Sequence, residues 1–241
     1  PNGYRCYSSR QLYAFQLIRT LRELGLSLEE IRSYLARRSP QGLTTLLKSQ
    51  QQWLEGELRR YRRMQRMVKN NIAMLEQAMQ VPCGIVTLEE WPRSRIVVSE
   101  KVRSLPFAEH DTFIQRYINE CREKELDDGY PPGAMVARED FSLGREQDIS
   151  YYFIRTDRPE RAIPAKYLGS RPAGRYAVLY QQGDYMDTRE AYAKLRRFLG
   201  ENQLQPGAYS YEEYISEDMC SDHPEDYVTR IAVPVESAGL R

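Results

Sequence analysis

The chain has 241 residues, which is enough for two domains with cores of their own. Hydrophobic residues make up 41% and charged residues 29%, the balance of a globular protein rich in helix, and no apolar run is long enough to argue for a membrane span. The net charge of +1 hides an asymmetry, because basic residues dominate from Arg5 to Lys69 and acidic residues after Glu89. A basic arm of this kind most often binds nucleic acid.

The cysteines argue against a zinc site and against a disulfide framework. Cys6, Cys83, Cys121 and Cys220 lie far apart, and none falls in a CxxC spacing. Free cysteines without a signal peptide are typical of a cytoplasmic protein, and neither a metal nor a cofactor is expected. The chain opens on "PNGYRCY" without an initiator Met, so we expect it to be the later part of a longer protein.

Two short helices are predicted first, in "SSRQLYAFQLIRTLRELGLSLEEIRSYLARRS". Apolar residues recur there at helical spacing, and Ser9 is placed to cap the first helix, which ends at Gly25. Ser27 begins the second helix, and Glu30, three residues later, completes a capping box. We assign residues 1–41 to this first domain.

A long helix without proline is predicted from about Leu43 to Met79, in a segment bounded at residues 42–81. A helix of ~37 residues rises about 55 Å, which is more than a small domain can bury. Its apolar seam is regular enough to predict a coiled-coil dimer, and the alternative is a long helix packed on its own domain. The predicted dimerisation residues are Leu47, Leu54, Leu58, Tyr61, Val68, Ile72 and Leu75.

The pattern changes after residue 82 to the apolar alternation of β-strands. Strands are predicted in "SRIVVSEKV", "GAMVARED", "ISYYFIRT", "RYAVLYQQG", "AYSYEEYIS" and "VTRIAVPVE", with helices over 108–124 and 188–201. "PPGAMVARED" and "QPGAYSYEEY" share Pro-Gly-Ala, and each follows a strand and a helix and precedes another strand. Two copies of strand–helix–strand–strand predict an α+β ligand-binding domain over 82–241, with a concave face between its halves.

Few residues are candidates for catalysis. His110 and His223 lie in unrelated contexts, no Ser or Cys has a nucleophile-elbow pattern, and no Gly-rich phosphate loop follows a strand. Glu212 and Glu213 are adjacent on a predicted strand, so their side chains point to opposite faces and cannot act as a pair. We therefore expect no catalytic residues and no enzymatic activity.

The stretch "YSYEEYI" suggests a pocket for a cation instead. One of its two glutamates is expected in solvent, and the other on a covered face among aromatic rings. A buried carboxylate without a partner is costly and aromatic faces attract cations, so such a cleft suits a bulky organic cation. The alternative is that both glutamates lie at the surface and that the tyrosines are ordinary residues of a sheet.

The segment "NGYRCYSSRQLYAFQLIRTLRELGLSLEEIRSYL" resembles the second half of the DNA-binding domain of MerR-family transcription regulators, in which an R-x-Y wing precedes such a helix pair. The long helix agrees with that family's antiparallel dimerisation helix. From about Ile85 the chain resembles the gyrase-inhibitor-like effector domain of the family's multidrug sensors. There "YEEY" matches a Tyr-Glu-x-Tyr strand and "TRIAVPV" the closing strand, so the two resemblances cover essentially the whole chain.

This combination implies a dimeric, drug-sensing activator. In such proteins effector binding distorts an operator whose promoter spacer is too long, so that RNA polymerase engages both promoter elements. The implied partners are double-stranded promoter DNA, RNA polymerase, lipophilic cationic small molecules and a second copy of the chain. The family's metal sensors carry paired cysteines where Cys83 stands alone. A protein that sequesters drugs or peptides, or that hydrolyses a bound drug, is the alternative.

The resemblance also implies site residues, although the family's recognition helix would precede Pro1, so that the base-reading residues lie outside this sequence. Tyr4, Arg5 and Tyr7 match wing positions that contact phosphates, and Arg10 and Arg19 are further candidates for contacts with DNA. Such contacts position a protein on DNA without reading its sequence. The Tyr-Glu-x-Tyr register places the acidic partner of the ligand at Glu212. The candidate pocket residues are Glu212, Tyr214, Tyr227, Phe107, Tyr130, Tyr152, Tyr176 and Tyr185.

Overall fold

The structure is a computed structural model that describes residues 8–103, 105–216 and 220–237. The chain divides into two compact units, Pro1–Arg63 and Met64–Arg241, and the boundary falls inside a long helix. Among the described residues, no helix is both long and apolar enough to cross a lipid bilayer.

The first unit is a small helical cluster. Helix α1 spans Ser9–Glu23, and helix α2 spans Leu28–Ala36. Leu21, Leu26 and Ile31 are buried together and form its core. The two predicted short helices are therefore present.

Both helices of this unit begin with a capping box. Ser27 and Glu30 form the predicted one at α2. The cap of α1 is Ser8, one residue before the predicted Ser9, because the Ser8 hydroxyl accepts the Gln11 N–H at 3.3 Å. The Gln11 side chain in turn accepts the Ser8 N–H at 2.8 Å. These reciprocal bonds satisfy backbone donors that a helix start leaves unpaired.

Helix α3 spans Pro40–Gln80 and is longer than predicted at its start. Pro40 fits there, because the first helical position needs no N–H donor. The Ser39 hydroxyl accepts the Gly42 N–H at 3.0 Å and supports this first turn. The predicted seam stays largely uncovered by the rest of the chain. The exposed fractions are 38% for Leu47, 45% for Leu54, 49% for Leu58, 60% for Tyr61, 59% for Val68 and 51% for Ile72, while Leu75 is half-buried.

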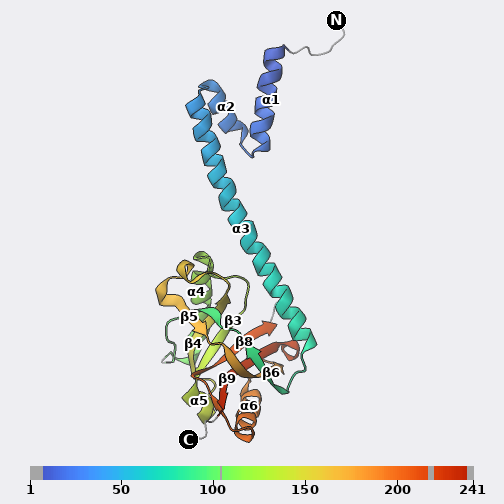
Figure 1. The fold of residues 1–241 in the computed structure, drawn as a ribbon, viewed down its shortest axis with the longest axis vertical. Helices are drawn as coiled ribbons and strands as arrows, with labels where there is room; N and C mark the ends of the chain where they lie inside the picture. Colours follow the sequence, from blue (N-terminus) through green and yellow to red (C-terminus); the bar gives the residue numbers. More distant parts are fainter. Residues whose placement is uncertain (1–7, 104, 217–219, 238–241) are drawn as a thin grey trace. The chain divides into compact units, whose positions relative to one another are not determined.

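The second unit is built on one large antiparallel sheet with the order β1-β6-β9-β8-β3-β4-β2-β5, and β7 pairs with β9 (Figure 1). The strands are β1 (Val86–Trp91), β2 (Ser94–Val98), β3 (Pro132–Ala137), β4 (Ile149–Thr156), β5 (Leu168–Arg171), β6 (Gly174–Gln182), β7 (Leu204–Pro206), β8 (Tyr209–Ser216) and β9 (Val228–Ser237). The helices are α4 (His110–Glu123), α5 (Arg138–Leu143) and α6 (Arg189–Glu201), with 3-10 turns η1 (Phe107–Glu109), η2 (Glu160–Ala162), η3 (Ala165–Tyr167) and η4 (Pro224–Asp226).

The sheet is two similar halves joined at the β3–β8 pair. From that pair the order runs β8-β9-β6 on one side and β3-β4-β2 on the other, with β1 and β5 at the edges. Each half contains one crossover helix, α4 or α6, so the predicted duplicated α+β architecture is confirmed. One predicted strand is shorter than expected, because α5 begins at Arg138.

The helices α4 and α6 cover one face of this sheet. Leu195 of α6 packs with Leu179 of β6, and Phe113 of α4 packs with Ile154 of β4. The opposite face carries a second apolar cluster that includes Tyr211 of β8. Because side chains alternate along a strand, Glu212 lies on the helix-covered face. Glu213 lies on the other.

Candidate ligand-binding site

Glu212 is a buried carboxylate at the centre of the duplicated sheet. Only 5% of the residue is exposed, and β8, which carries it, lies between β3 and β9. The hydroxyl of Tyr192, a fully buried residue of α6, donates a hydrogen bond to Glu212 Oε2 at 3.1 Å. Ser210, also on β8, lies 3.4 Å from the same hydroxyl. The side chain of Glu212 is therefore held under α6 and away from bulk water.

The carboxylate opens onto a cavity of about 340 Å³ between the two halves of the sheet. The first half contributes the side of α4 from His110 to Ile118, the segment 146–149, and Tyr152 of β4. The second half contributes Tyr214 of β8 together with Tyr185, Met186 and Thr188. Three tyrosines and several aliphatic side chains thus surround Glu212. A cavity of this size and character can hold a small aromatic molecule.

The cavity lining is acidic. Asp111, Glu146 and Glu212 contribute carboxylates, and none of the lining residues is a lysine or an arginine. Within the described parts of the chain, no ion pair with a lysine or arginine neutralises Glu212. A cation that entered this cavity would therefore meet an uncompensated negative charge among aromatic rings.

Burial raises the pKa of Glu212 to about 7. Hydrogen bonds from Tyr192 and Tyr214 act in the opposite direction, and the nearby charge of Glu146 raises the pKa further. The negative charge of ionised Glu212 is thus stabilised less in this cavity than it would be by water. A bound cation would stabilise this negative charge.

Glu213, the next residue, has the opposite surroundings. Its side chain is fully buried and forms ion pairs with Arg155 at 2.6 Å, Arg171 at 3.1 Å and Arg230 at 2.7 Å. Burial alone would raise the pKa of Glu213, but the three positive charges outweigh it and hold the pKa at about 2. The prediction that one of the two glutamates lies in solvent is wrong, because these arginines make burial of a second carboxylate possible.

The structure brings four of the eight candidate pocket residues together. Glu212, Tyr152, Tyr185 and Tyr214 line the same cavity. Tyr227 does not line it but stacks behind Tyr185, with ring centroids 6.0 Å apart.

Two other candidates lie elsewhere. Tyr176 stacks on Trp91 at 4.7 Å, on the face of the sheet that carries Glu213. The ring of Tyr130 lies under the guanidinium of Arg155 at 4.3 Å. The side chain of Phe107 lies outside the described residues.

The candidate DNA-contacting residues are largely beyond what the structure describes. Tyr4, Arg5 and Tyr7 lie outside the described residues, and so does the side chain of Arg10. Arg19 is exposed on α1.

Sequence reasoning did not identify several residues that contact Glu212 or line its cavity. Tyr192 sits on the inner face of α6 beside Leu195, where the helical pattern marks it as core. Glu146 falls in a connection between α5 and β4, where an acidic residue carries no signal of burial. His110 and Met186 belong to segments that the tertiary fold alone brings to Glu212.

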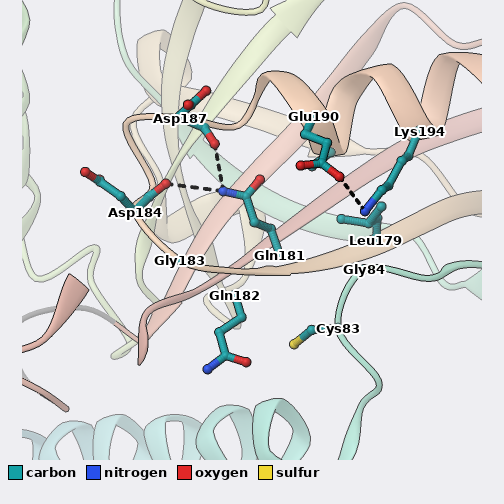
Figure 2. Close-up of a pocket in the computed structure, with 11 residues that line it drawn as sticks. Cys83, Gly84, Leu179, Gln181, Gln182, Gly183, Asp184, Asp187, Glu190 and Lys194 are labelled. Atoms are coloured by element: carbon teal, nitrogen blue, oxygen red, sulfur yellow. Dashed lines mark hydrogen bonds and ion pairs between the residues drawn. The ribbon is translucent and has the colours of Figure 1, made fainter. Parts of the chain in front are cut away.

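A second cavity, of about 490 Å³, is lined by residues of the connection between β6 and α6 and of both these elements (Figure 2). Its charged side chains are exposed and pair locally: Glu190 with Lys194 at 3.0 Å, and Asp187 with Arg189 at 2.9 Å. The Gln181 amide donates to the backbone oxygens of two residues of the 183–188 connection, as Figure 2 shows. Because Asp184, Asp187 and Glu190 are all exposed to solvent, this cavity is a weaker candidate for a cation site. No group of three or more His, Cys, Asp or Glu in the described chain could hold a metal ion.

A helical unit is thus joined by a long helix to a duplicated sheet whose acidic, aromatic cavity suits a small-molecule ligand. The family described as MerR HTH family regulatory protein matches residues 1–38, and the GyrI-like small molecule binding domain matches residues 86–236. The curated "Multidrug-efflux transporter 2 regulator" of Bacillus subtilis (strain 168) is 30% identical over 235 residues, covering 98% of this chain and 84% of that protein. The chain therefore belongs to the MerR family of transcription regulators and carries a GyrI-like small-molecule-binding domain.

Two solved structures share the fold. A cryo-EM structure of the EcmrR–DNA complex matches with a TM-score of 0.52 and 19% identity, covering 98% of this chain and 87% of that chain. A crystal structure of the EcmrR C-terminal domain matches with a TM-score of 0.51 and 18% identity, covering 64% of this chain and 98% of that chain. The predicted combination of long helix and effector domain is thus confirmed.

Proposed function

We propose that this regulator is a transcription activator whose effectors are lipophilic aromatic cations, and that they bind in the cavity around Glu212. The observation that carries the proposal is a buried carboxylate that no lysine or arginine of the described chain neutralises, in a cavity lined by Tyr152, Tyr185 and Tyr214. The ligand's positive charge would offset the negative charge of Glu212. The tyrosine rings would stack on the aromatic groups of the ligand.

The expected macromolecular partners are promoter DNA, RNA polymerase and a second copy of the chain. The match of residues 1–38 to a helix-turn-helix family supports DNA binding, and the name of the Bacillus subtilis relative supports a role in multidrug response. The exposed apolar stripe of α3 supports a dimer, since so regular a stripe is costly to leave in water. Ligand-induced distortion of the operator is the activation step that the family resemblance implies.

Calorimetric titration with tetraphenylphosphonium tests the proposed site. The Glu212→Gln variant keeps the size of the side chain and removes its charge, so affinity should fall by about tenfold or more. Glu190→Gln is the matched control, because Glu190 is an exposed residue of the neighbouring cavity. An affinity that Glu212→Gln leaves unchanged would contradict the assignment.

We further propose that the cavity binds its ligands without converting them. The Bacillus subtilis relative, whose match covers both parts of the chain, is named as a regulator, which supports this role. Mass spectrometry of candidate cations after prolonged incubation with the protein tests it. New products that disappear in Glu212→Gln would instead identify a drug hydrolase.

A further inference from the structure

Glu146 is a second buried carboxylate in the cavity that contains Glu212. It precedes β4, and its side chain is 4% exposed. Arg196 of α6 binds it from outside the cavity lining, with Nη1 at 3.1 Å from Glu146 Oε2. The same Nη1 donates to the backbone oxygen of Phe141 at 3.2 Å. Arg196 is thus shared between two acceptors, and it contacts one of the two carboxylate oxygens of Glu146.

The charges around the cavity do not balance. Three carboxylates, those of Asp111, Glu146 and Glu212, line it, and Arg196 is the cation paired with one of them at its edge. When all three are ionised, the lining and Arg196 together carry two net negative charges, and one of the carboxylates, Asp111, is exposed to solvent. A ligand with a single positive charge would neutralise half of that excess. The proximity of Glu146 and Glu212 is also unfavourable while both are ionised, as the influence of Glu146 on Glu212 indicates.

We propose that Glu146 is a specificity-determining residue: it forms a second anionic subsite, so the cavity favours aromatic ligands with two separated cationic groups, one for Glu212 and one for Glu146. This inference rests on the proposed function and narrows its ligand class. The second cationic group would share the Glu146 carboxylate with Arg196. Glu146 and Glu212 are both buried, and charged groups that meet at buried positions interact more strongly than at a surface, so the second pair should add measurable affinity.

A structural role for Glu146 makes a different prediction. The Arg196 contact could serve merely to hold the segment 144–148 against α6. Glu146→Gln separates the two roles, because an amide oxygen still accepts the Arg196 hydrogen bond while the negative charge is lost. If the role is structural, the substitution changes the affinity for singly and doubly charged ligands equally. If the role is ligand selection, it affects the doubly charged ligand more.

The experiment compares a rigid aromatic dication, 4′,6-diamidino-2-phenylindole, with its analogue that has a single amidine. Fluorescence titrations at pH 8 keep Glu212 mostly ionised. Glu146→Gln should weaken binding of the dication about tenfold more than binding of the monocation. Glu190→Gln, which removes one negative charge from the neighbouring cavity (Figure 2), should leave the ratio of the two affinities unchanged.

The outcomes separate this inference from the proposed function. If Glu212→Gln weakens both ligands while Glu146→Gln affects them equally or not at all, the cation site stands and the second subsite is wrong. If the unmodified protein binds neither ligand, both proposals fail. If Glu146→Gln does not fold, Arg196→Gln provides the test. This substitution removes the cation that competes for Glu146, so the affinity for the dication should rise relative to that for the monocation. An unchanged preference would overturn the inference.

Discussion

Glu212 and Glu213 are neighbours on β8, yet their carboxylates lie on opposite faces of the sheet in opposite electrostatic surroundings. Glu212 faces a cavity without a lysine or arginine, whereas Glu213 is bound by three arginines. The alternation of a strand places the two charges within one residue of each other in sequence and keeps them apart in space. One carboxylate is therefore available to a ligand, while the other belongs to the fixed structure of the sheet.

The raised pKa of Glu212 predicts a stability effect with a definite sign. Its pKa rises from 4.5 to about 7 on folding, so the folded state holds the proton more tightly than the unfolded state. The resulting stability is fully present below pH 4.5 and is lost as the pH rises through 7. At about 1.4 kcal/mol per pH unit, ionised Glu212 costs roughly 3 kcal/mol at pH 8.

Glu212→Gln should therefore raise the free energy of unfolding of the second unit at pH 8, by about 2–3 kcal/mol, and change it little at pH 4.5. Urea denaturation monitored at both pH values measures this difference. Glu190→Gln, at an exposed position, serves as a control without pH dependence. A Glu212→Gln variant that is less stable at pH 8 than the unmodified protein would show that the carboxylate is already compensated.

Cation affinity should depend on pH through the same group. With a pKa of about 7, roughly a tenth of Glu212 is ionised at pH 6 and roughly nine tenths at pH 8. Affinity for tetraphenylphosphonium should thus rise about tenfold over this range, since the cation binds the ionised form. Calorimetry in a buffer series at constant ionic strength measures the effect. If the affinity of the Glu212→Gln variant depended on pH in the same way, the titrating group would be another residue.

The periodic parts of the fold were predictable from sequence. Alternating apolar residues identified the strands β2, β3, β4, β6, β8 and β9, and helical spacing identified α4, α6 and the three helices before them. The strands β1, β5 and β7 were missed because two are only four and three residues long, and β1 alternates weakly at the edge of the sheet. The Pro-Gly-Ala repeat indicated the duplication, since β3 and β8 are the paired central strands.

The chemistry of the site was less predictable. Strand alternation correctly separated Glu212 from Glu213, but it could not reveal that both faces are covered. The arginines that bind Glu213 come from β4, β5 and β9, which are distant in sequence and meet through sheet pairing. Glu146 likewise lines the Glu212 cavity only because the sheet pairs in this way, and the connection that contains it has no periodic sequence pattern. Burial of an isolated charge is a property of tertiary packing.

The arginine cluster around Glu213 should be a major stabilising element of the sheet. Glu213→Ala leaves Arg155, Arg171 and Arg230 buried together without their shared partner, and loss of one member of a buried ionic group costs about 3–5 kcal/mol. Urea denaturation at pH 7 measures this loss. Glu201→Ala, at an exposed position near the end of α6, is the control that should cost less than about 0.5 kcal/mol. Equal stability of the two variants would contradict the ionic role.

The apolar stripe of α3 predicts a dimer that a single charge disrupts. Leu54 is 45% exposed although it lies on the regular seam of the helix, so within this chain its side chain lacks the cover that such a seam requires. Leu54→Glu would place a carboxylate in the predicted interface, where it must either lose its water or separate the two helices. We expect monomers in sedimentation velocity at micromolar concentration. Gln52→Glu, which adds the same charge at an exposed polar position of the same helix, should remain dimeric. If Leu54→Glu sediments as the unmodified dimer does, the two copies associate through another surface. The stripe would then need a different partner to cover it.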